Sequence, residues 1–207
     1  MIISVRHILF IAVLVSLCTR TETKQWAIPL HSADANLKIT LPRELNSIKE
    51  SVHQSDCEPC GKYHTVVADV DFMSRIEDTT GFFTPWLSDT TPTSIFYIEE
   101  QLHPESYPSN GNHDFQKELN LIVDRLKYED PRIKVLKQET GDNRALIVYE
   151  TFTKSGAIAS KRIECLTYID NRFIEIHFIQ YKNFQNKFIE IIWTSLLEMK
   201  IEKINVR

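Results

Sequence analysis

The sequence predicts an α+β domain in which an antiparallel β-sheet is packed by helices. Four strand-like segments follow one another in the last third of the chain, and the short turns between them connect antiparallel rather than parallel neighbours. Two further segments carry apolar residues at helical spacing. Strands and helices therefore occur in separate runs instead of alternating, as they would in a fold with a parallel sheet.

The first 18 residues have the pattern of a secretory signal peptide. The run from Ile8 to Leu17 is apolar except for Ser16. It is too short for a membrane-spanning helix, which needs about 20 residues, but it fits the core of a signal peptide. Cleavage after Cys18 gives a secreted or periplasmic protein. Alternatively, Cys18 becomes a lipidated N-terminus and tethers the protein to a membrane, although Leu17 is bulky for such a signal.

Residues 19–35 are expected to form a flexible lead-in, because they are polar apart from the segment Trp26 to Leu30. We expect one α+β domain over residues 36–207, since no repeat or linker divides that part of the chain. Its first element is a strand from Leu37 to Leu41, where apolar and polar residues alternate. The proline that follows cannot continue a strand ladder.

The middle of the chain contains strand-like segments separated by loops. Leu45, Ile48 and Val52 fit a helical stripe, but a strand fits the segment equally well. Strands are predicted over 63–73 and 94–102, and loops rich in proline, glycine or serine over 79–92 and 103–112.

The last part of the chain is predicted to be a meander between two helices. Apolar residues from Phe115 to Leu126 lie on one helical face, and Asn112 or Asp114 can cap the start of this helix. A second apolar face begins at Phe184, with Asn183 as a candidate cap. Strands are predicted between these helices over 132–138, 144–152, 161–169 and 172–181.

Three features of this order carry a resemblance to a known group. An early strand ends in a proline at Pro42, a helix precedes the meander, and the segment Tyr168 to Ile176 (YIDNRFIEI) leads into the terminal helix. Over residues 36–200 the pattern resembles the PsbP/Mog1-like superfamily, which includes bacterial envelope proteins of the DcrB type. The resemblance implies an α/β/α sandwich and an accessory or binding role. It transfers no catalytic residue, because none can be matched.

The most distinctive local motif is H-x3-C-x2-C-x3-H, formed by His53, Cys57, Cys60 and His64. Two thiolates and two imidazoles are a ligand set for tetrahedral Zn²⁺. Zinc sites usually take their ligand pairs from separate segments, however, whereas these four residues are close together. We favour a Cys57–Cys60 disulfide in an oxidising compartment, and thiol exchange is a third interpretation. No cofactor is otherwise expected.

Two further features are candidates for a buried group and a contact surface. Cys165 alternates with apolar residues and is expected to be a buried thiol, unless it pairs with Cys57 or Cys60. Phe82, Phe83 and Trp86 lie in a loop that contains a proline. They either fold back onto the core or form an exposed patch that binds a partner.

Several function classes are excluded or disfavoured. The net charge is −4 and no basic stripe is present, so we expect no nucleic-acid partner. The five glycines are isolated, which excludes a classical dinucleotide-binding loop or P-loop. No G-x-S-x-G, H-E-x-x-H or S-x-x-K motif occurs. His177 shares a strand face with Glu175, and we interpret it as a solvated or satisfied histidine rather than a catalyst.

These observations predict a secreted or envelope-associated accessory or binding protein without enzymatic activity. Its ligand is an unidentified protein or small molecule. The alternative is a periplasmic metal- or thiol-handling protein that uses residues 53–64. A third hypothesis is an enzyme whose active site follows no known motif and lies in the cleft between the sheet and the helices.

Overall fold

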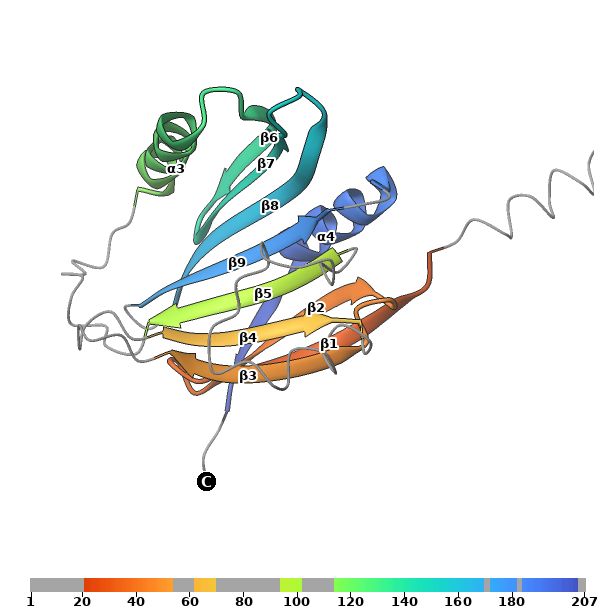
Figure 1. Ribbon diagram of the computed structural model, residues 1–207. Coiled ribbons are helices and arrows are strands. Elements are labelled where there is room, and N and C mark those ends of the chain that lie inside the picture. The colour runs from red at the N-terminus through yellow and green to blue at the C-terminus, as the bar shows by residue number, and fades with distance from the viewer. Residues whose placement is uncertain are drawn as a thin grey trace, which may run out of the picture.

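A computed structural model of the chain describes residues 21–53, 62–69, 94–101, 114–169, 172–181 and 184–204 (Figure 1). Within these residues the chain forms two antiparallel sheets and two helices. The smaller sheet has the strand order β1 (Thr23–Leu30), β2 (Ala35–Pro42) and β10 (Lys200–Lys203). The larger sheet has seven strands, in the order β3 (Ser47–His53), β4 (Lys62–Ala68), β5 (Ser94–Gln101), β9 (Arg172–Gln180), β8 (Ile158–Ile169), β7 (Arg144–Phe152) and β6 (Lys134–Gly141). The helices are α3 (Phe115–Glu129) and α4 (Asn186–Glu198).

The predicted meander is confirmed as strands β6 to β9, each paired antiparallel with the next. The turn between β7 and β8 contains Gly156, whose φ of 86° is in the left-handed region that glycine adopts without steric cost. Strand β9 then pairs on its other side with β5, which brings the early strands against the meander. The segment that fitted either a helix or a strand is strand β3, paired along its length with β4.

The expectation of a loose lead-in over residues 19–35 differs from the structure. Thr23–Leu30 forms strand β1, which pairs with β2 over its full length. Ile28 and Leu30 of this strand are buried in the main core, and their burial favours an ordered strand. Strand β10 was not predicted either, and it pairs with the opposite edge of β2.

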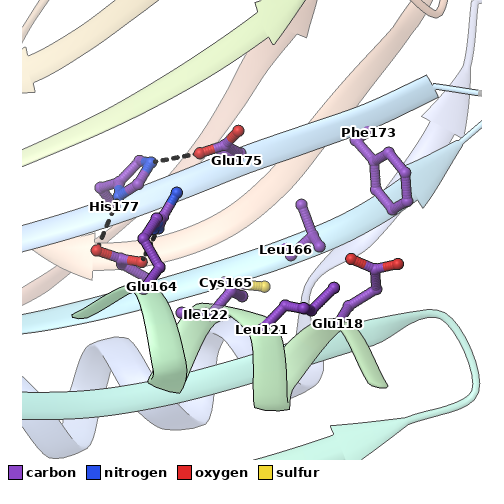
Figure 2. A pocket seen from close by; sticks show the side chains of 10 residues that line it. Glu118, Leu121, Ile122, Glu164, Cys165, Leu166, Phe173, Glu175 and His177 are labelled. Atoms are coloured by element: carbon purple, nitrogen blue, oxygen red, sulfur yellow. Dashed lines mark hydrogen bonds and ion pairs between the residues drawn. The ribbon is translucent and has the colours of Figure 1, made fainter. Parts of the chain in front are cut away.

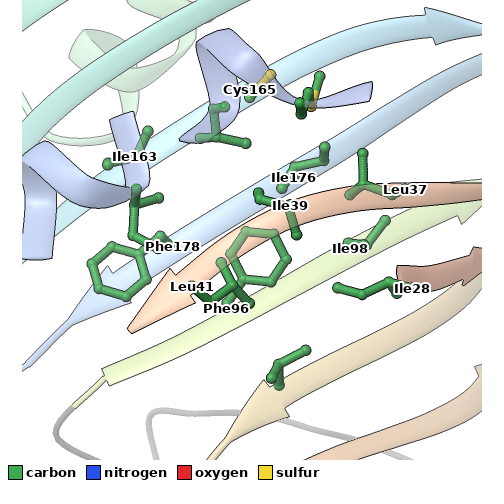
Figure 3. Packing of buried hydrophobic residues seen from close by; sticks show 14 of the residues in the cluster. Ile28, Leu37, Ile39, Leu41, Phe96, Ile98, Ile163, Cys165, Ile176 and Phe178 are labelled. Carbon is green, nitrogen blue, oxygen red and sulfur yellow. The ribbon is translucent and has the colours of Figure 1, made fainter. Parts of the chain in front are cut away.

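The two helices pack on opposite faces of the seven-stranded sheet (Figure 1). Helix α4 and the three-stranded sheet cover the same face of the seven-stranded sheet. Their apolar residues form the main core together with the inward-facing residues of β5, β8 and β9 (Figure 3). Helix α3 packs on the other face through Phe115, Leu119 and Leu126, against β6 and β7. The α+β class is therefore confirmed, and the α/β/α sandwich is confirmed in part, because the layer that contains α4 also contains strands.

The helix ends agree with one of the predicted caps. The side chain of Asp114 accepts hydrogen bonds from the backbone N–H groups of Gln116 and Lys117, each at 3.1 Å, which caps α3. The other candidate for this helix, Asn112, and the candidate for α4, Asn183, lie outside the described residues. Residue Gln185 precedes α4 and makes no capping hydrogen bond with its side chain. No helix in the described ranges is long and apolar enough to cross a bilayer.

Candidate functional site

A pocket of about 200 Å³ lies between α3 and strands β8 and β9, on the sheet face opposite the main core (Figure 2). Helix α3 packs on this face over β6 and β7, and the pocket opens beside it. The apolar part of its wall consists of Leu121, Ile122, Leu166 and Phe173. The wall also contains Cys165 and the charged or polar residues Glu118, Arg125, Glu164, Glu175 and His177.

Residue Glu164 is fixed by contacts with two elements. One carboxylate oxygen, Oε1, accepts a hydrogen bond from the Tyr149 hydroxyl at 2.5 Å. The other, Oε2, accepts from Nη2 of Arg125 on α3 at 3.2 Å. The side chain of Glu164 is only 13% exposed. Burial, and secondarily the charge of Glu164, raise the pKa of Tyr149, so this phenol remains a hydrogen-bond donor at neutral pH.

Residue His177 lies between two carboxylates and is held by an aromatic contact. Its ring stacks on Tyr97 with 4.5 Å between centroids, and its side chain is 11% exposed. The Nδ1 atom is 3.9 Å from Oε1 of Glu164, and the Nε2 atom is 3.6 Å from Oε2 of Glu175. The neighbouring His177 imidazole lowers the pKa of Glu175 to about 2, so Glu175 is a carboxylate at neutral pH.

The register of the sheet extends this group of polar side chains toward β4. Glu175 lies directly opposite Glu99 of β5, and Glu99 lies directly opposite His64 of β4. Oε2 of Glu99 accepts a hydrogen bond from Nζ of Lys62 at 2.6 Å, and Oε1 lies 3.7 Å from Nδ1 of His64. We call His64, Glu99, Glu175 and His177 the polar strip. It contains two imidazoles and two carboxylates from three neighbouring strands.

The structure places some of the predicted site residues and leaves others untested. Cys57 and Cys60 lie outside the described residues, as do Phe82, Phe83, Trp86 and the candidate lipidation site Cys18. His53 is the last residue of β3, and His64 belongs to the polar strip. The proposed Cys57–Cys60 disulfide, zinc binding by this motif and the aromatic contact patch therefore stay predictions.

The prediction of a buried thiol at Cys165 is confirmed. Cys165 is 1% exposed and unbonded to another cysteine, and its side chain belongs to the main core (Figure 3). Burial raises the pKa of this thiol to about 12. A thiol with such a pKa is almost entirely protonated at neutral pH and is a poor nucleophile.

Sequence reasoning placed His177 and Glu175 on one strand face but missed the residues that meet them there. Glu164 alternates with the core residues Ile163 and Cys165, which identifies its face but not its neighbours. Glu118 and Arg125 are seven positions apart on α3, close to two full helical turns, so they lie on the same side of the helix. This spacing could have indicated from the sequence that Glu118 and Arg125 contribute to the same site.

Comparison with solved structures gives a fold relationship. Cyanobacterial PsbP (CyanoP) from Synechocystis sp. PCC 6803 is similar with a TM-score of 0.52 and 7% sequence identity, over 88% of this chain and 94% of that chain. The Saccharomyces cerevisiae Ran-binding protein Mog1p has a TM-score of 0.46 and 8% identity, over 86% and 96% of the two chains. No family model and no curated protein sequence matches. On the comparison with CyanoP, the chain has the PsbP/Mog1-like fold that the order of its elements predicted.

Proposed function

We propose that the protein is a non-catalytic binding or accessory protein whose ligand site is the pocket between α3 and strands β8 and β9. The observation that carries this proposal is the composition of the pocket wall. An apolar surface from two elements is combined with a few converging charged groups, which is the usual composition of a ligand site. A PsbP/Mog1-like fold is in keeping with an accessory role.

The charges of the pocket favour a cationic ligand with an apolar body. Three carboxylates, those of Glu118, Glu164 and Glu175, line the pocket with one guanidinium, that of Arg125. Arg125 is already engaged by Glu164. Leu121 and Phe173 offer apolar contact area beside the carboxylates. An organic ammonium ion, or a lysine or arginine side chain of a partner protein, has both required parts.

The chemistry of the pocket supports binding over covalent catalysis. Cys165 is the one thiol in the described wall, and its side chain lies in the core with a raised pKa. His177 is stacked on Tyr97 and lies between Glu164 and Glu175, so it faces carboxylates rather than a nucleophile that it could activate. Robust turnover of substrates from hydrolase or oxidoreductase panels by the purified protein would contradict a purely binding role.

The protein is proposed to act outside the cytoplasm, on the basis of residues 1–18. Expression of the full chain in a secreting host, followed by mass spectrometry of the mature protein, tests this part separately. Loss of the first 18 residues supports secretion, and a lipid adduct on Cys18 supports a membrane-tethered form. A full-length chain that stays in the cytoplasm would contradict both.

The pocket assignment is tested with a matched pair of probes, phenethylamine and its neutral analogue 2-phenylethanol. Isothermal titration calorimetry is expected to show saturable binding of the amine, at least fivefold tighter than binding of the alcohol. Glu118→Gln removes one carboxylate from the pocket and is expected to reduce this preference. Glu129→Gln, an exposed change at the far end of the same helix, should leave it unchanged. Equal affinity for both probes, or no binding of the amine, would contradict the proposal.

A further inference from the structure

We propose that the polar strip contains a site for a divalent transition-metal ion, with Glu99, Glu175 and His177 as ligands. One carboxylate oxygen from each glutamate and one imidazole nitrogen lie within 4.8 Å of one another. The three residues come from two strands that are distant in sequence, β5 and β9. This inference goes beyond the proposed function and does not depend on it. The site shares Glu175 and His177 with the pocket, but its ligands are identified by the distances between their donor atoms.

The sheet register brings the three ligands together. Glu99 and Glu175 are directly opposed across β5 and β9. His177 lies two residues further along β9, so it projects from the same face as Glu175. Directly opposed like charges destabilise a strand pair. Lys62 offsets the charge of Glu99 at 2.6 Å, and a cation between the two carboxylates would be attracted by both.

The imidazole of His177 gives a second and independent indication of a ligand. Its Nε2 atom is fully buried and makes no hydrogen bond with any residue that the structure describes. Its contact with Oε2 of Glu175, at 3.6 Å, is an ion pair and is longer than a normal hydrogen bond. Buried polar nitrogens are nearly always partnered in native proteins. A metal ion at this position would give Nε2 the direct bond that it lacks.

The surroundings of His177 match those of a metal-bound histidine. Such histidines usually direct their second nitrogen toward a carboxylate, which fixes the ring and its tautomer. Figure 2 shows Glu164 on the Nδ1 side of the ring, where its Oε1 lies 3.9 Å from Nδ1, beyond hydrogen-bond distance. The Tyr149 hydroxyl donates to the same Oε1 at 2.5 Å and fixes this carboxylate. The stack on Tyr97 restricts rotation of the ring. The stack therefore holds the ring with Nδ1 on the side of Glu164 and Nε2 on the side of the proposed ion.

The donor set indicates the class of metal. An imidazole with two carboxylates suits Zn²⁺ and related first-row ions, whereas Ca²⁺ and Mg²⁺ prefer oxygen ligands alone. Three protein ligands leave at least one coordination position open. Glu175 and His177 also line the pocket beside α3, so an ion bound here would form part of the pocket wall.

The test must separate this site from the cysteine motif, so it uses the full chain with Cys57→Ser and Cys60→Ser as the background. Calorimetric titration with Zn²⁺ is expected to show one ion bound per chain, and much weaker binding of Ca²⁺. His177→Gln should weaken Zn²⁺ binding at least tenfold. His31→Gln is the matched control, because Nε2 of His31 also lies beside a glutamate, 3.2 Å from Oε2 of Glu50, and it should leave the affinity unchanged.

Circular dichroism shows whether His177→Gln is folded. If it is not, a second variant and the spectrum of bound Co²⁺ still test the proposal. Glu175→Gln, at a side chain that is 35% exposed, should also weaken binding at least tenfold. Co²⁺ bound in the same background should show ligand-field bands that His177→Gln abolishes. Zn²⁺ affinity that is unchanged in His177→Gln and Glu175→Gln, or lost entirely in the cysteine background, would overturn the proposal. Phenethylamine binding measured without metal reports on the pocket alone, so the two proposals can fail separately.

Discussion

The carboxylate of Glu100 connects the two sheets of the molecule. Glu100 is 1% exposed at the end of β5, and three donors from the turn between β1 and β2 converge on it. The backbone N–H of His31 donates to Oε1 at 3.2 Å, and the backbone N–H and the hydroxyl of Ser32 donate to Oε2 at 2.9 and 2.6 Å. Arg172 of β9 donates to the carbonyl oxygen of Ser32 and reinforces the same junction.

Replacing Glu100 with glutamine is expected to lower the free energy of unfolding by about 2 kcal/mol. The loss arises because the charged acceptor is removed and an amide N–H₂ faces buried donors. Urea denaturation of the two proteins measures the difference. Glu129→Gln, at an exposed position of α3, is the control and should change stability by less than about 0.5 kcal/mol. Equal losses in both variants would show that Glu100 does not hold the sheets together.

The raised pKa of Tyr149 predicts that the folded protein becomes less stable at alkaline pH. Burial raises its pKa in the folded protein above the ordinary value of 10.0. A group with a raised folded-state pKa contributes stability that is complete below its unfolded pKa and is lost as the pH rises toward the folded pKa. The free energy of unfolding should therefore fall above about pH 10, with a contribution from this residue of up to about 1.4 kcal/mol per pH unit.

Urea denaturation between pH 8 and 11 measures this decrease. Tyr149→Phe removes the titrating group and should make the decrease shallower. Tyr128→Phe changes a tyrosine that is 91% exposed and should keep the wild-type slope. A Tyr149→Phe protein with the wild-type slope would contradict the assignment of this decrease to the buried phenol.

The two helices allow a matched comparison at the level of elements. Asp114 caps α3 with two side-chain hydrogen bonds, whereas the residue at the same position of α4, Gln185, makes none. Asp114→Ala is expected to cost about 1 kcal/mol of unfolding free energy, and Gln185→Ala close to zero. Thermal or urea denaturation compares them. A larger loss from Gln185→Ala than from Asp114→Ala would contradict the capping geometry.

The elements that could be predicted from the sequence are those in which apolar residues recur at a regular helical or strand spacing. The apolar face from Phe115 to Leu126 gave α3, and four alternating segments with short turns gave the meander. Strand β1 was missed because its first residues, Thr23 to Gln25, are polar and show no apolar alternation. Its Pro29 is tolerated because β1 is an edge strand of the three-stranded sheet. Strand β10 has four residues with Ile201 as its single apolar one, too few for a period to be visible.

At the scale of the whole molecule, the site depends on pairings between distant segments. The alternation of β9 placed Glu175 and His177 on one face, and this could be read from the sequence. The opposition of Glu99 and Glu175 depends on the register between β5 and β9. A shift of one residue would turn Glu99 to the other face, and no local pattern in the sequence specifies that register. The sequence therefore predicted the part of the site that lies within strand β9, but not its contact with Glu99 of β5.

Binding at the pocket between α3 and strands β8 and β9 is tested most directly by nuclear magnetic resonance. Phenethylamine is added to isotope-labelled protein, and the change in each amide chemical shift is followed to saturation. The largest changes are expected at the apolar wall, around Leu121, Ile122, Leu166 and Phe173. Changes that gather at residues 53–64 or 82–86, or that are spread evenly over the chain without saturation, would contradict a binding site on this face of the sheet.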